Sequence, residues 1–283
     1  MTKPVIITAD SACDLSAVLL EKYQIITIPL TIVVGEQSFQ DGIDFQPDDI
    51  YACYHEKKML PKTAAISPMS YSEFFREFAE AGFAVVHISI SANISSTYQN
   101  ACVAASEMED VYIVDSRHLS AGEALAAIEG CRLRDAGLEA HKIAAELEDF
   151  TQRINSSFVL DTLEFMWKGG RCSGVTAMGA NLLKLRPCLE MRDGCLRVCK
   201  KYRGSIHRVY VQYILDRLSS EKVQRNICFI AHSSELSDNE IDSLKRHIRK
   251  CAPFDEINVI RAGCAVSSHC GPGALGVFFV HEL

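Results

Sequence analysis

Apolar runs alternate with segments of helical spacing through the first half of the chain. Four runs predict buried strands, namely Val5–Ala9, Ile25–Val34, Phe83–Ile90 and Val111–Val114. The segments around them repeat apolar residues at helical intervals and begin near Asp14, Pro47, Ser67, Tyr98, Ser120 and His141. Strands that are joined through helices must run parallel, because each crossover returns the chain to the same edge. The pattern therefore predicts an α/β domain with a mostly parallel sheet.

After residue 155 the pattern changes, and short strands are joined by hairpins as well as by helices. Expected strands are Phe158–Asp161, Cys188–Met191, Cys195–Tyr202, Ile227–Ala231, Ile257–Arg261 and Leu275–Val280. Expected helices span 163–168, 175–185, 205–218 and 237–250. Such a mixture predicts an α+β layer with a mixed or antiparallel sheet. We therefore predict a two-domain fold, with an N-terminal α/β domain at 1–155 and a C-terminal α+β domain at 156–283.

Three short signals sharpen the boundaries of these elements. Asp193-Gly194 between two strands is typical of a tight β-hairpin. Two Ser-x-x-Glu patterns, at Ser120–Glu123 and Ser237–Glu240, predict capping boxes at helix N-termini. They indicate helices that begin just after each serine.

The segment Ser89–Ala101 places hydroxyl side chains where a buried strand turns into a helix. Ser95, Ser96 and Thr97 lie in this turn. Free backbone N–H groups and the helix dipole favour an anion at such a position, and ligands of open α/β sheets bind at this edge. The plainer alternative is that Ser95 only caps the helix. The local sequence leaves both open.

Composition narrows the classes of function. The net charge of −7 argues against non-specific nucleic-acid binding. The N-terminus predicts a first strand rather than a signal peptide, and no apolar run approaches the roughly 20 residues of a membrane span. We therefore expect a cytoplasmic protein with no transmembrane segment, whose 12 cysteines stay reduced. Their spacing does not form the paired pattern of a metal site, so we expect no metal and no cofactor.

Three further residues stand in loops that could bind a ligand. Thr63 lies in 61–68, His269 lies in the glycine-rich stretch 266–276, and Arg171 follows two glycines. Glycine allows a ligand or a second chain to approach the backbone closely. The plainer interpretations are a turn hydroxyl, a histidine with ordinary hydrogen bonds and a solvated arginine.

Several motifs in order along the chain resemble the DegV family, the fatty-acid-binding proteins that serve as carrier subunits of bacterial fatty acid kinases. The resemblance covers nearly the whole chain and rests on Thr8–Leu15, Asp41-Gly42, Ser91–Gln99, Val114–Ser116, Gly170–Ser173, Leu185–Pro187, Lys201–Gly204 and His269–Leu275. Three positions depart from the family pattern: Ser96 replaces a usual glycine, Cys172 a larger aliphatic residue, and Gly174 a common basic residue.

The resemblance implies a DegV-like fold with a long-chain fatty acid in a tunnel largely within the second domain. It implies that Thr63, Ser95 and His269 hold the carboxylate, together with backbone N–H groups near Ser96. A separate kinase subunit would phosphorylate the bound carboxylate, and acyltransferases at the membrane would receive the acyl phosphate. By the same resemblance Arg171 docks the kinase, with Arg203 as a weaker candidate, and both could stabilise the head group instead.

On this interpretation the chain is a non-catalytic lipid carrier. The sequence lacks a Walker loop and a kinase glycine-rich loop with its partner lysine. Two other classes stay open. One is a hydrolase that uses Ser95 with His269, although no GxSxG motif is present. The other is a stand-alone lipid-binding or sensing protein with no kinase partner.

Overall fold

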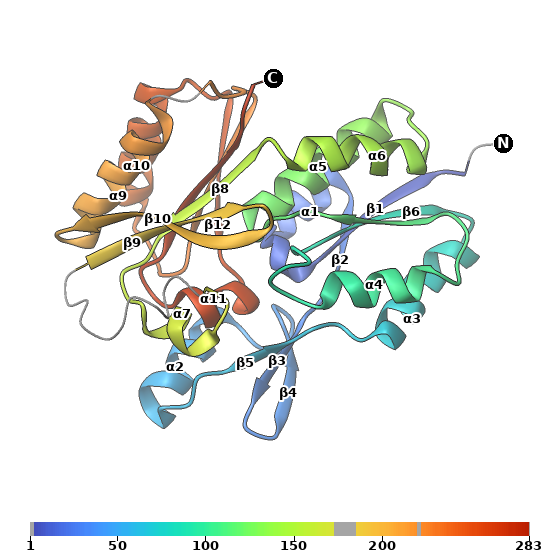
Figure 1. Cartoon of the computed structure of the whole chain (residues 1–283), viewed down its shortest axis with the longest axis horizontal. Helices are drawn as coiled ribbons and strands as arrows, with labels where there is room; N and C mark the ends of the chain where they lie inside the picture. The colour runs from blue at the N-terminus through green and yellow to red at the C-terminus, as the bar shows by residue number, and fades with distance from the viewer. Residues whose placement is uncertain (1–2, 173–184, 220–221, 283) are drawn as a thin grey trace.

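The strands of this protein form three separate sheets. The computed structural model describes residues 3–172, 185–219 and 222–282. In this part of the chain the sheets have four, six and three strands. Figure 1 shows the two larger sheets side by side, with the smallest sheet projecting below them. The expectation of an α/β fold with a parallel N-terminal sheet and a mixed C-terminal sheet is confirmed.

The N-terminal sheet is parallel throughout, in the order β2-β1-β6-β7. Its strands are β1 (Val5–Asp10), β2 (Ile25–Ile28), β6 (Ala84–Ser89) and β7 (Val111–Asp115). The connecting elements are η1 (Ser11–Cys13), α1 (Ala17–Tyr23), α3 (Pro68–Glu80), α4 (Thr97–Ala105), α5 (Ala121–Asp135) and α6 (Ala140–Thr151). Every residue of β6 is buried. A strand covered on both faces explains why this segment is a continuous apolar run rather than an alternating one.

The smallest sheet was not predicted. It is antiparallel, in the order β4-β3-β5, with β3 (Thr31–Val34), β4 (Gln37–Gln40) and β5 (Lys62–Ala64), and α2 (Pro47–Lys57) packs beside it. The expected single strand Ile25–Val34 is wrong, because the chain leaves one sheet after Ile28 and enters another at Thr31. Pro29 lies at this break, where a residue without an N–H cannot continue a ladder. The expected loop at 61–68 is also wrong in part, since Thr63 lies on β5.

The C-terminal sheet has the order β10-β9-β8-β13-β11-β12. Its strands are β8 (Ile154–Val159), β9 (Leu185–Arg192), β10 (Cys195–Arg203), β11 (Ile227–His232), β12 (Glu256–Arg261) and β13 (Leu275–Val280). Only β11 and β12 pair in parallel. The predicted hairpin is confirmed: Asp193 and Gly194 both have positive φ, as its tight turn requires. The expected strand Phe158–Asp161 begins earlier, at Ile154.

Four helices lie within the described residues of the C-terminal half. They are α7 (Glu164–Gly169), α9 (Ile206–Leu218), α10 (Asp238–Cys251) and α11 (Cys264–Cys270). The capping box of α10 is confirmed, with Ser237 and Glu240 exchanging hydrogen bonds. Helix α11 was not predicted, because His269 was expected in a glycine-rich loop. The expected helix 175–185 falls on residues outside the described part of the chain, except for Leu185, which begins β9.

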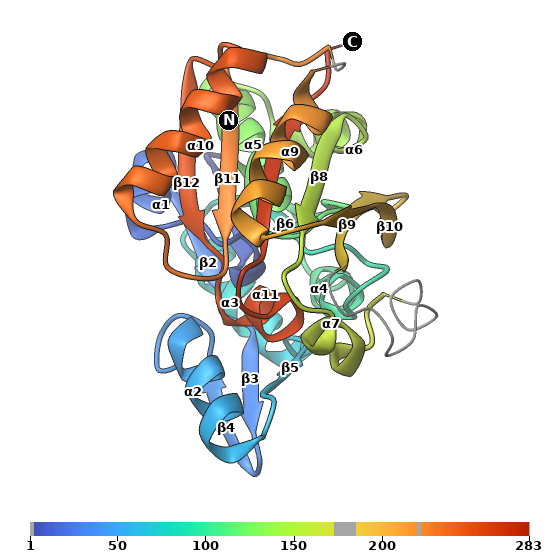
Figure 2. The ribbon, with the colours of Figure 1, turned by 90° about the vertical axis from the view of Figure 1, so that its left-hand side faces the viewer.

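Helix α5 lies between the two large sheets, and ten of its fifteen residues are buried. Its buried side chains share one apolar cluster with Ile7 and Val86 of the first sheet and with Phe229 and Phe278 of the second. The two halves of the chain are therefore packed through a common core. On the other side of the second sheet, α9 and α10 cover a separate apolar cluster (Figure 2).

The capping box expected at Ser120 and Glu123 is wrong. Ser120 makes no capping hydrogen bond, and its hydroxyl donates to Asp14 instead. Glu123 is fully buried beneath the first sheet. The tertiary contacts of both side chains override the local pattern.

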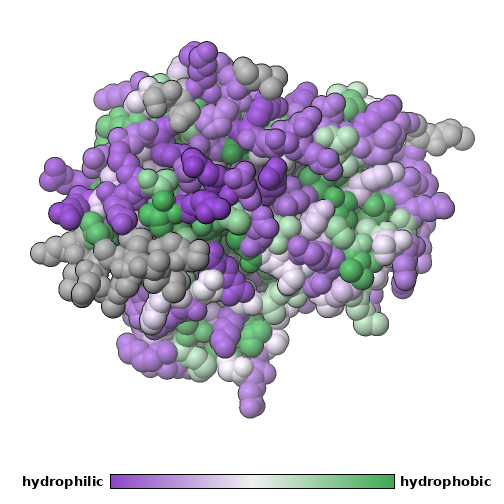
Figure 3. Space-filling view, in the orientation of Figure 1, coloured by the Kyte–Doolittle hydropathy of each residue, from purple (hydrophilic) through white to green (hydrophobic). Residues whose placement is uncertain are grey.

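Polar residues cover most of the face seen in Figure 3, and apolar residues appear there in small groups. No helix within the described residues is long and apolar enough to cross a membrane.

Candidate ligand-binding site

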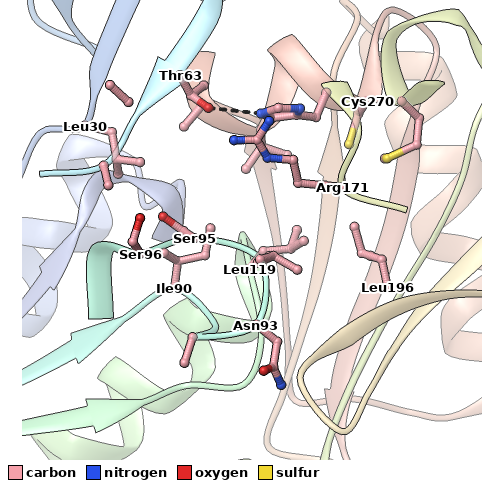
Figure 4. Close-up of a pocket in the computed structure, with 18 of the residues that line it drawn as sticks. Leu30, Thr63, Ile90, Asn93, Ser95, Ser96, Leu119, Arg171, Leu196 and Cys270 are labelled. Carbon is pink, nitrogen blue, oxygen red and sulfur yellow. Dashed lines mark hydrogen bonds between the residues drawn. The ribbon is translucent and has the colours of Figure 1, made fainter. Parts of the chain in front are cut away.

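A cavity of about 470 Å³ opens where the three sheets approach one another (Figure 4). Its wall combines β5, the turn between β6 and α4, the end of α7 and the residues after it, β10, and α11. This volume lies within the range of about 300–1,000 Å³ that is usual for small-molecule sites. Five of the six predicted site residues line it: Thr63, Ser95, Ser96, Arg171 and His269. Thr63 on β5 and His269 on α11, which are 206 positions apart in the sequence, thus meet in one place.

Thr63 and His269 are in direct contact at the mouth of the cavity. The Thr63 hydroxyl and His269 Nε2 are 3.0 Å apart, and Figure 4 shows this hydrogen bond. Burial, reinforced by the positive charge of Arg171, lowers the pKa of His269 to about 4. At neutral pH the ring is therefore uncharged, and it can donate or accept a hydrogen bond depending on its tautomer.

Ser95 and Ser96 lie in the predicted turn between β6 and α4, and Figure 4 shows both at the cavity. Ser95 Oγ accepts a hydrogen bond from the Thr97 N–H at 3.2 Å and lies 2.7 Å from Thr97 Oγ1. Ser95 therefore contacts the first turn of the helix, as the plainer alternative expected, and it also faces the cavity. His269 is bonded to Thr63, so the structure does not pair it with Ser95 as the hydrolase hypothesis would require.

Arg171 is exposed and lies beside the Thr63–His269 pair in Figure 4. Its guanidinium donates a hydrogen bond to the Gly169 carbonyl at 2.7 Å. Gly170 ends α7 with a φ of +68°, a conformation that suits glycine. The glycine pair therefore turns the chain so that Arg171 reaches the cavity mouth.

Gly169 has a second role that the sequence did not indicate. A Cβ atom at this position would lie 2.2 Å from His269 Nδ1. That nitrogen is buried and has no hydrogen-bond partner among the described residues. The absence of a side chain at Gly169 is what allows the end of α7 to pack against the imidazole ring.

The remaining predicted positions are more distant. Arg203 is exposed at the end of β10, paired in register with Leu185, and does not line the cavity. Cys172 is buried, and its thiol donates to the Leu196 carbonyl at 3.6 Å. Gly174 lies outside the described residues. A docking role for Arg203 stays a prediction, while its position gives no support to a head-group role.

The tip of the β9–β10 hairpin holds the segment that carries Ser95. The Ser91 hydroxyl donates to the Gly194 carbonyl at 2.8 Å, and Asn93 Nδ2 donates to the Asp193 carbonyl at 3.0 Å. These contacts join the N-terminal turn to the C-terminal sheet. Sequence reasoning found the hairpin and the turn separately, but no local signal indicated that they touch.

Two carboxylates from the N-terminal half hold the start of α11. Asp41 accepts hydrogen bonds from the backbone N–H groups of Cys264 and Ala265 at 2.7 and 3.2 Å. Asp14 accepts one from the Gly263 N–H at 2.8 Å. These N–H groups would otherwise lack partners at a helix N-terminus. The helix that presents His269 is thus positioned by residues far away in sequence.

A buried group of carboxyls lies behind this junction. Burial raises the pKa of Asp10 to about 6, although Ile90, Ala12 and Ser89 donate hydrogen bonds to it. Burial also raises the pKa of Glu123 well above its usual range, and the nearby Asp10 charge adds to this effect.

No group of three or more His, Cys, Asp or Glu residues in the described part of the chain is arranged to hold a metal ion.

The interior of the cavity is apolar. Its apolar lining residues are Leu30, Ile90, Ile94, Leu119, Phe158, Met166, Leu196, Ala265, Val266 and Cys270. A second, smaller cavity of about 20 Å³ shares Leu119, Phe158, Val266 and Cys270 with it. The two cavities are therefore adjacent and share an apolar wall.

The polar groups at the mouth suit an anion. They are hydroxyls, the side-chain amides of Asn93 and Gln99, a neutral imidazole and one arginine, and no acidic side chain is among the described residues that line the cavity. A buried carboxylate is costly unless several donors meet it, and hydroxyls with a guanidinium supply such donors. Fold and site together define an α/β protein with an internal amphipathic cavity that is open to an organic anion.

Comparison with known proteins identifies the family. A family model described as "Uncharacterised protein, DegV family" matches residues 4–282, and the chain belongs to this family. A DegV domain-containing protein of Clostridium perfringens is 31% identical over 286 residues, which cover 100% of both chains.

Two solved structures share the fold over 100% of both chains. A DegV family protein from Thermus thermophilus, described for its fatty acid binding, has a TM-score of 0.89 and 25% identity. A Thermotoga maritima protein, described as revealing a fatty acid binding function, has a TM-score of 0.84 and 24% identity.

Proposed function

We propose that this chain binds one long-chain fatty acid, with its carboxylate at the mouth of the cavity and its tail in the apolar interior. The observation that carries the proposal is that one cavity is lined both by hydrogen-bond donors, with no described acidic side chain, and by many apolar residues. The fatty acid binding described for related structures supports it. Thr63, Ser95 and His269 would meet the carboxylate, with a backbone N–H near Ser96.

The energetics favour a long chain. Each buried methylene contributes about 0.8 kcal/mol, so a chain of roughly 14 to 16 carbons supplies on the order of 10 kcal/mol before the cost of ordering. The small second cavity, which shares Phe158 and Leu119 with the first, supports a tail that points toward the C-terminal half. The tail would therefore run into the C-terminal half.

We further propose that the chain is a carrier that presents the carboxylate to a separate kinase subunit, which forms the acyl phosphate for acyltransferases. In this arrangement the carboxylate would be the only part of the ligand that is exposed. Arg171 lies beside it at the cavity with an exposed side chain. An acyl phosphate is prone to hydrolysis, and a tail buried in the cavity would keep it attached to the carrier. No cofactor is needed for this role.

The binding proposal is tested by extracting lipid from freshly purified protein and identifying it by mass spectrometry. We expect about one long-chain fatty acid per chain. After delipidation, added oleate or palmitate should raise the melting temperature by mass action, and the methyl ester should raise it much less because it lacks the charge. Absence of lipid together with no thermal shift from either acid would refute binding.

The carrier proposal is tested with Arg171→Ala, using Arg249→Ala on the exposed end of α10 as the matched control. Both variants should change stability by less than about 0.5 kcal/mol, as is usual for surface charges. With a cognate kinase and ATP, we expect Arg171→Ala to retain lipid and lose acyl-phosphate formation, while the control keeps both. Parallel loss of lipid would instead assign Arg171 to the head group. Unimpaired phosphorylation would refute both roles, and no phosphorylation of the wild type would leave a stand-alone lipid-binding protein.

A further inference from the structure

Two cysteines lie across from each other on the β9–β10 hairpin at a β-bulge. Val198 pairs with Leu189 and Lys200 pairs with Cys188, so Cys199 is the extra residue of the bulged strand. In a bulge two residues oppose one, which brings Cys199 next to Cys188. The Cys199 thiol lies 3.4 Å from the Cys188 carbonyl oxygen, so its side chain turns toward the partner strand.

The backbone geometry at this position is compatible with a disulfide. Opposed Cα atoms in antiparallel strands are about 4.5–5.5 Å apart, and disulfides usually span about 4.4–6.8 Å. The two thiols are also close enough to shift each other's pKa, while the Cys188 thiol donates its hydrogen bond to the Leu189 carbonyl at 3.8 Å. Cys188 is paired with Lys200, and Cys199 directly precedes Lys200 on the bulged strand, so the two cysteines are adjacent across the hairpin.

The two thiols differ in exposure and in acidity. Cys199 is exposed, whereas Cys188 is fully buried. The adjacent Cys188 thiol lowers the pKa of Cys199, and the nearby Arg217 adds to this effect against burial and Glu190. The adjacent Cys199 thiol, together with burial, raises the pKa of Cys188. An exposed thiol with a lowered pKa beside a second, protonated thiol is the usual arrangement of an oxidation-sensitive pair.

We propose that Cys199 and Cys188 form a reversible modification site for hydrogen peroxide. The Cys199 thiolate attacks one peroxide oxygen, which breaks the O–O bond, forms the sulfenic acid and releases hydroxide. The Cys188 sulfur then attacks the sulfenic sulfur, breaking the S–O bond. The Cys188 proton and the departing hydroxide leave as water. Two thiols are oxidised by two electrons to one disulfide, and one peroxide is reduced to two waters.

The pair lies in the element that forms one wall of the cavity. Leu196, three residues before Cys199, lines the cavity, and the tip of the same hairpin contacts Ser91 and Asn93. Strand β10 is also at the edge of its sheet, so Cys199 is reached from solvent without opening the core. The proposal concerns the modification itself and does not depend on the identity of the ligand.

Peptide mapping tests the proposal, because trypsin separates the two cysteines. The protein is treated with a small excess of hydrogen peroxide at neutral pH, blocked with N-ethylmaleimide, digested and analysed without reduction. We expect a covalent pair of the peptides 185–192 and 198–200 that disappears after dithiothreitol. Cys195 on the same strand lies in peptide 193–197 and provides an internal control, which should stay alkylated. Before oxidation, Cys199 should react with a small excess of iodoacetamide about tenfold faster than the half-buried Cys102, whose pKa is raised by burial.

Two variants separate the steps. Cys188→Ser should leave the Cys199 sulfenic acid unresolved, so that dimedone traps it, whereas Cys199→Ser should show neither cross-link nor dimedone adduct. Circular dichroism of each variant before treatment checks that it is folded. The proposal is overturned if folded wild-type protein shows no 185–192/198–200 pair, if the cross-link joins two copies of the chain, or if Cys199 is oxidised irreversibly while Cys188 stays a thiol.

Discussion

Gly169 lies against the His269 ring with no room for a side chain, and Gly169→Ala tests this packing. The new Cβ would lie 2.2 Å from Nδ1, 3.1 Å from Cε1 and 3.3 Å from Cγ of the His269 ring. The whole ring must move, because the clash includes Cγ, where the ring joins the side chain, as well as Nδ1 and Cε1. That movement would break the 3.0 Å hydrogen bond to Thr63.

The size of the effect follows from three contributions. Alanine is favoured over glycine in a helix by about 1 kcal/mol, so without the clash the substitution would stabilise α7. Overpacking costs about 1–3 kcal/mol, and a lost hydrogen bond about 0.5–1.5 kcal/mol. We therefore expect the free energy of unfolding to fall by about 1–3 kcal/mol. Fatty acid affinity should fall about tenfold, equivalent to about 1.4 kcal/mol for one misplaced donor.

Gly170→Ala is the matched control. Gly170 has a φ of +68°, but nothing lies within 4 Å of its added Cβ. Backbone strain in Gly170→Ala should lower the free energy of unfolding by about 1–2 kcal/mol, and His269 should not be displaced. Chemical denaturation and displacement of a fluorescent fatty acid measure the two properties. We expect both variants to lose stability, and only Gly169→Ala to lose affinity.

A double-mutant cycle with His269→Ala isolates the contact. Once the ring is removed, Gly169→Ala should become neutral or stabilising, which gives a coupling energy of about 1–3 kcal/mol. If the two changes are additive in stability, or if Gly169→Ala binds the fatty acid as tightly as Gly170→Ala does, the ring is not held by this contact and the reasoning fails.

Three further predictions follow from the site and the core. Ser95→Ala should weaken binding of the fatty acid by about 1–2 kcal/mol and that of its methyl ester much less, measured by displacement. The raised pKa of Glu123 implies stability that is present at low pH and lost as the pH rises through the folded pKa. The melting temperature of Glu123→Gln should therefore exceed that of the wild type by a margin that grows from pH 4 to 8. Parallel plots of melting temperature against pH would contradict this. Gly271→Ala, with a φ of +70° and a Cβ 2.7 Å from Phe165, should cost about 3 kcal/mol in denaturant, against about 1 kcal/mol for the unobstructed Gly137→Ala.

The elements that could be predicted are those whose signal is local. The run 84–89 is apolar because both faces of β6 are buried, so its sequence and its environment agree. Asp193-Gly194 predicted the hairpin because positive φ at two successive residues restricts the residue types that fit. Ser237 and Glu240 predicted the start of α10 because their hydrogen bonds are made within one turn.

The elements that were missed depend on distant contacts. The residues of β3 have high strand propensity, but propensity does not indicate which sheet a strand joins, and the break at Pro29 was read as part of one strand. Ser120 and Glu123 matched a capping box, yet Ser120 bonds to Asp14, which is 106 residues away. A Ser-x-x-Glu pattern occurs both in helix caps and in buried polar groups, so the pattern alone cannot show which of the two is present.

Much of the candidate site was found by combining motifs rather than from any one of them. Thr63, Ser95, Arg171 and His269 each had a plainer interpretation, and the structure places these four and Ser96 around one cavity. Gly169 was not singled out, because the need for a missing Cβ is visible only when the imidazole lies against it. The sequence contains the residue, but the reason for it lies in the packing of α7 on α11.

The position of the cavity follows from the way α11 is held. A helix of seven residues is too short to be stable alone in water, and this one contains few strong helix formers. Its first N–H groups are instead satisfied by Asp41 and Asp14, which come from the N-terminal half. At its other end it presents His269 to Thr63. Carboxylates that follow the first strand and the small sheet therefore determine where an imidazole near the C-terminus lies. The mouth of the cavity exists only once the small sheet, the parallel sheet and α11 have assembled.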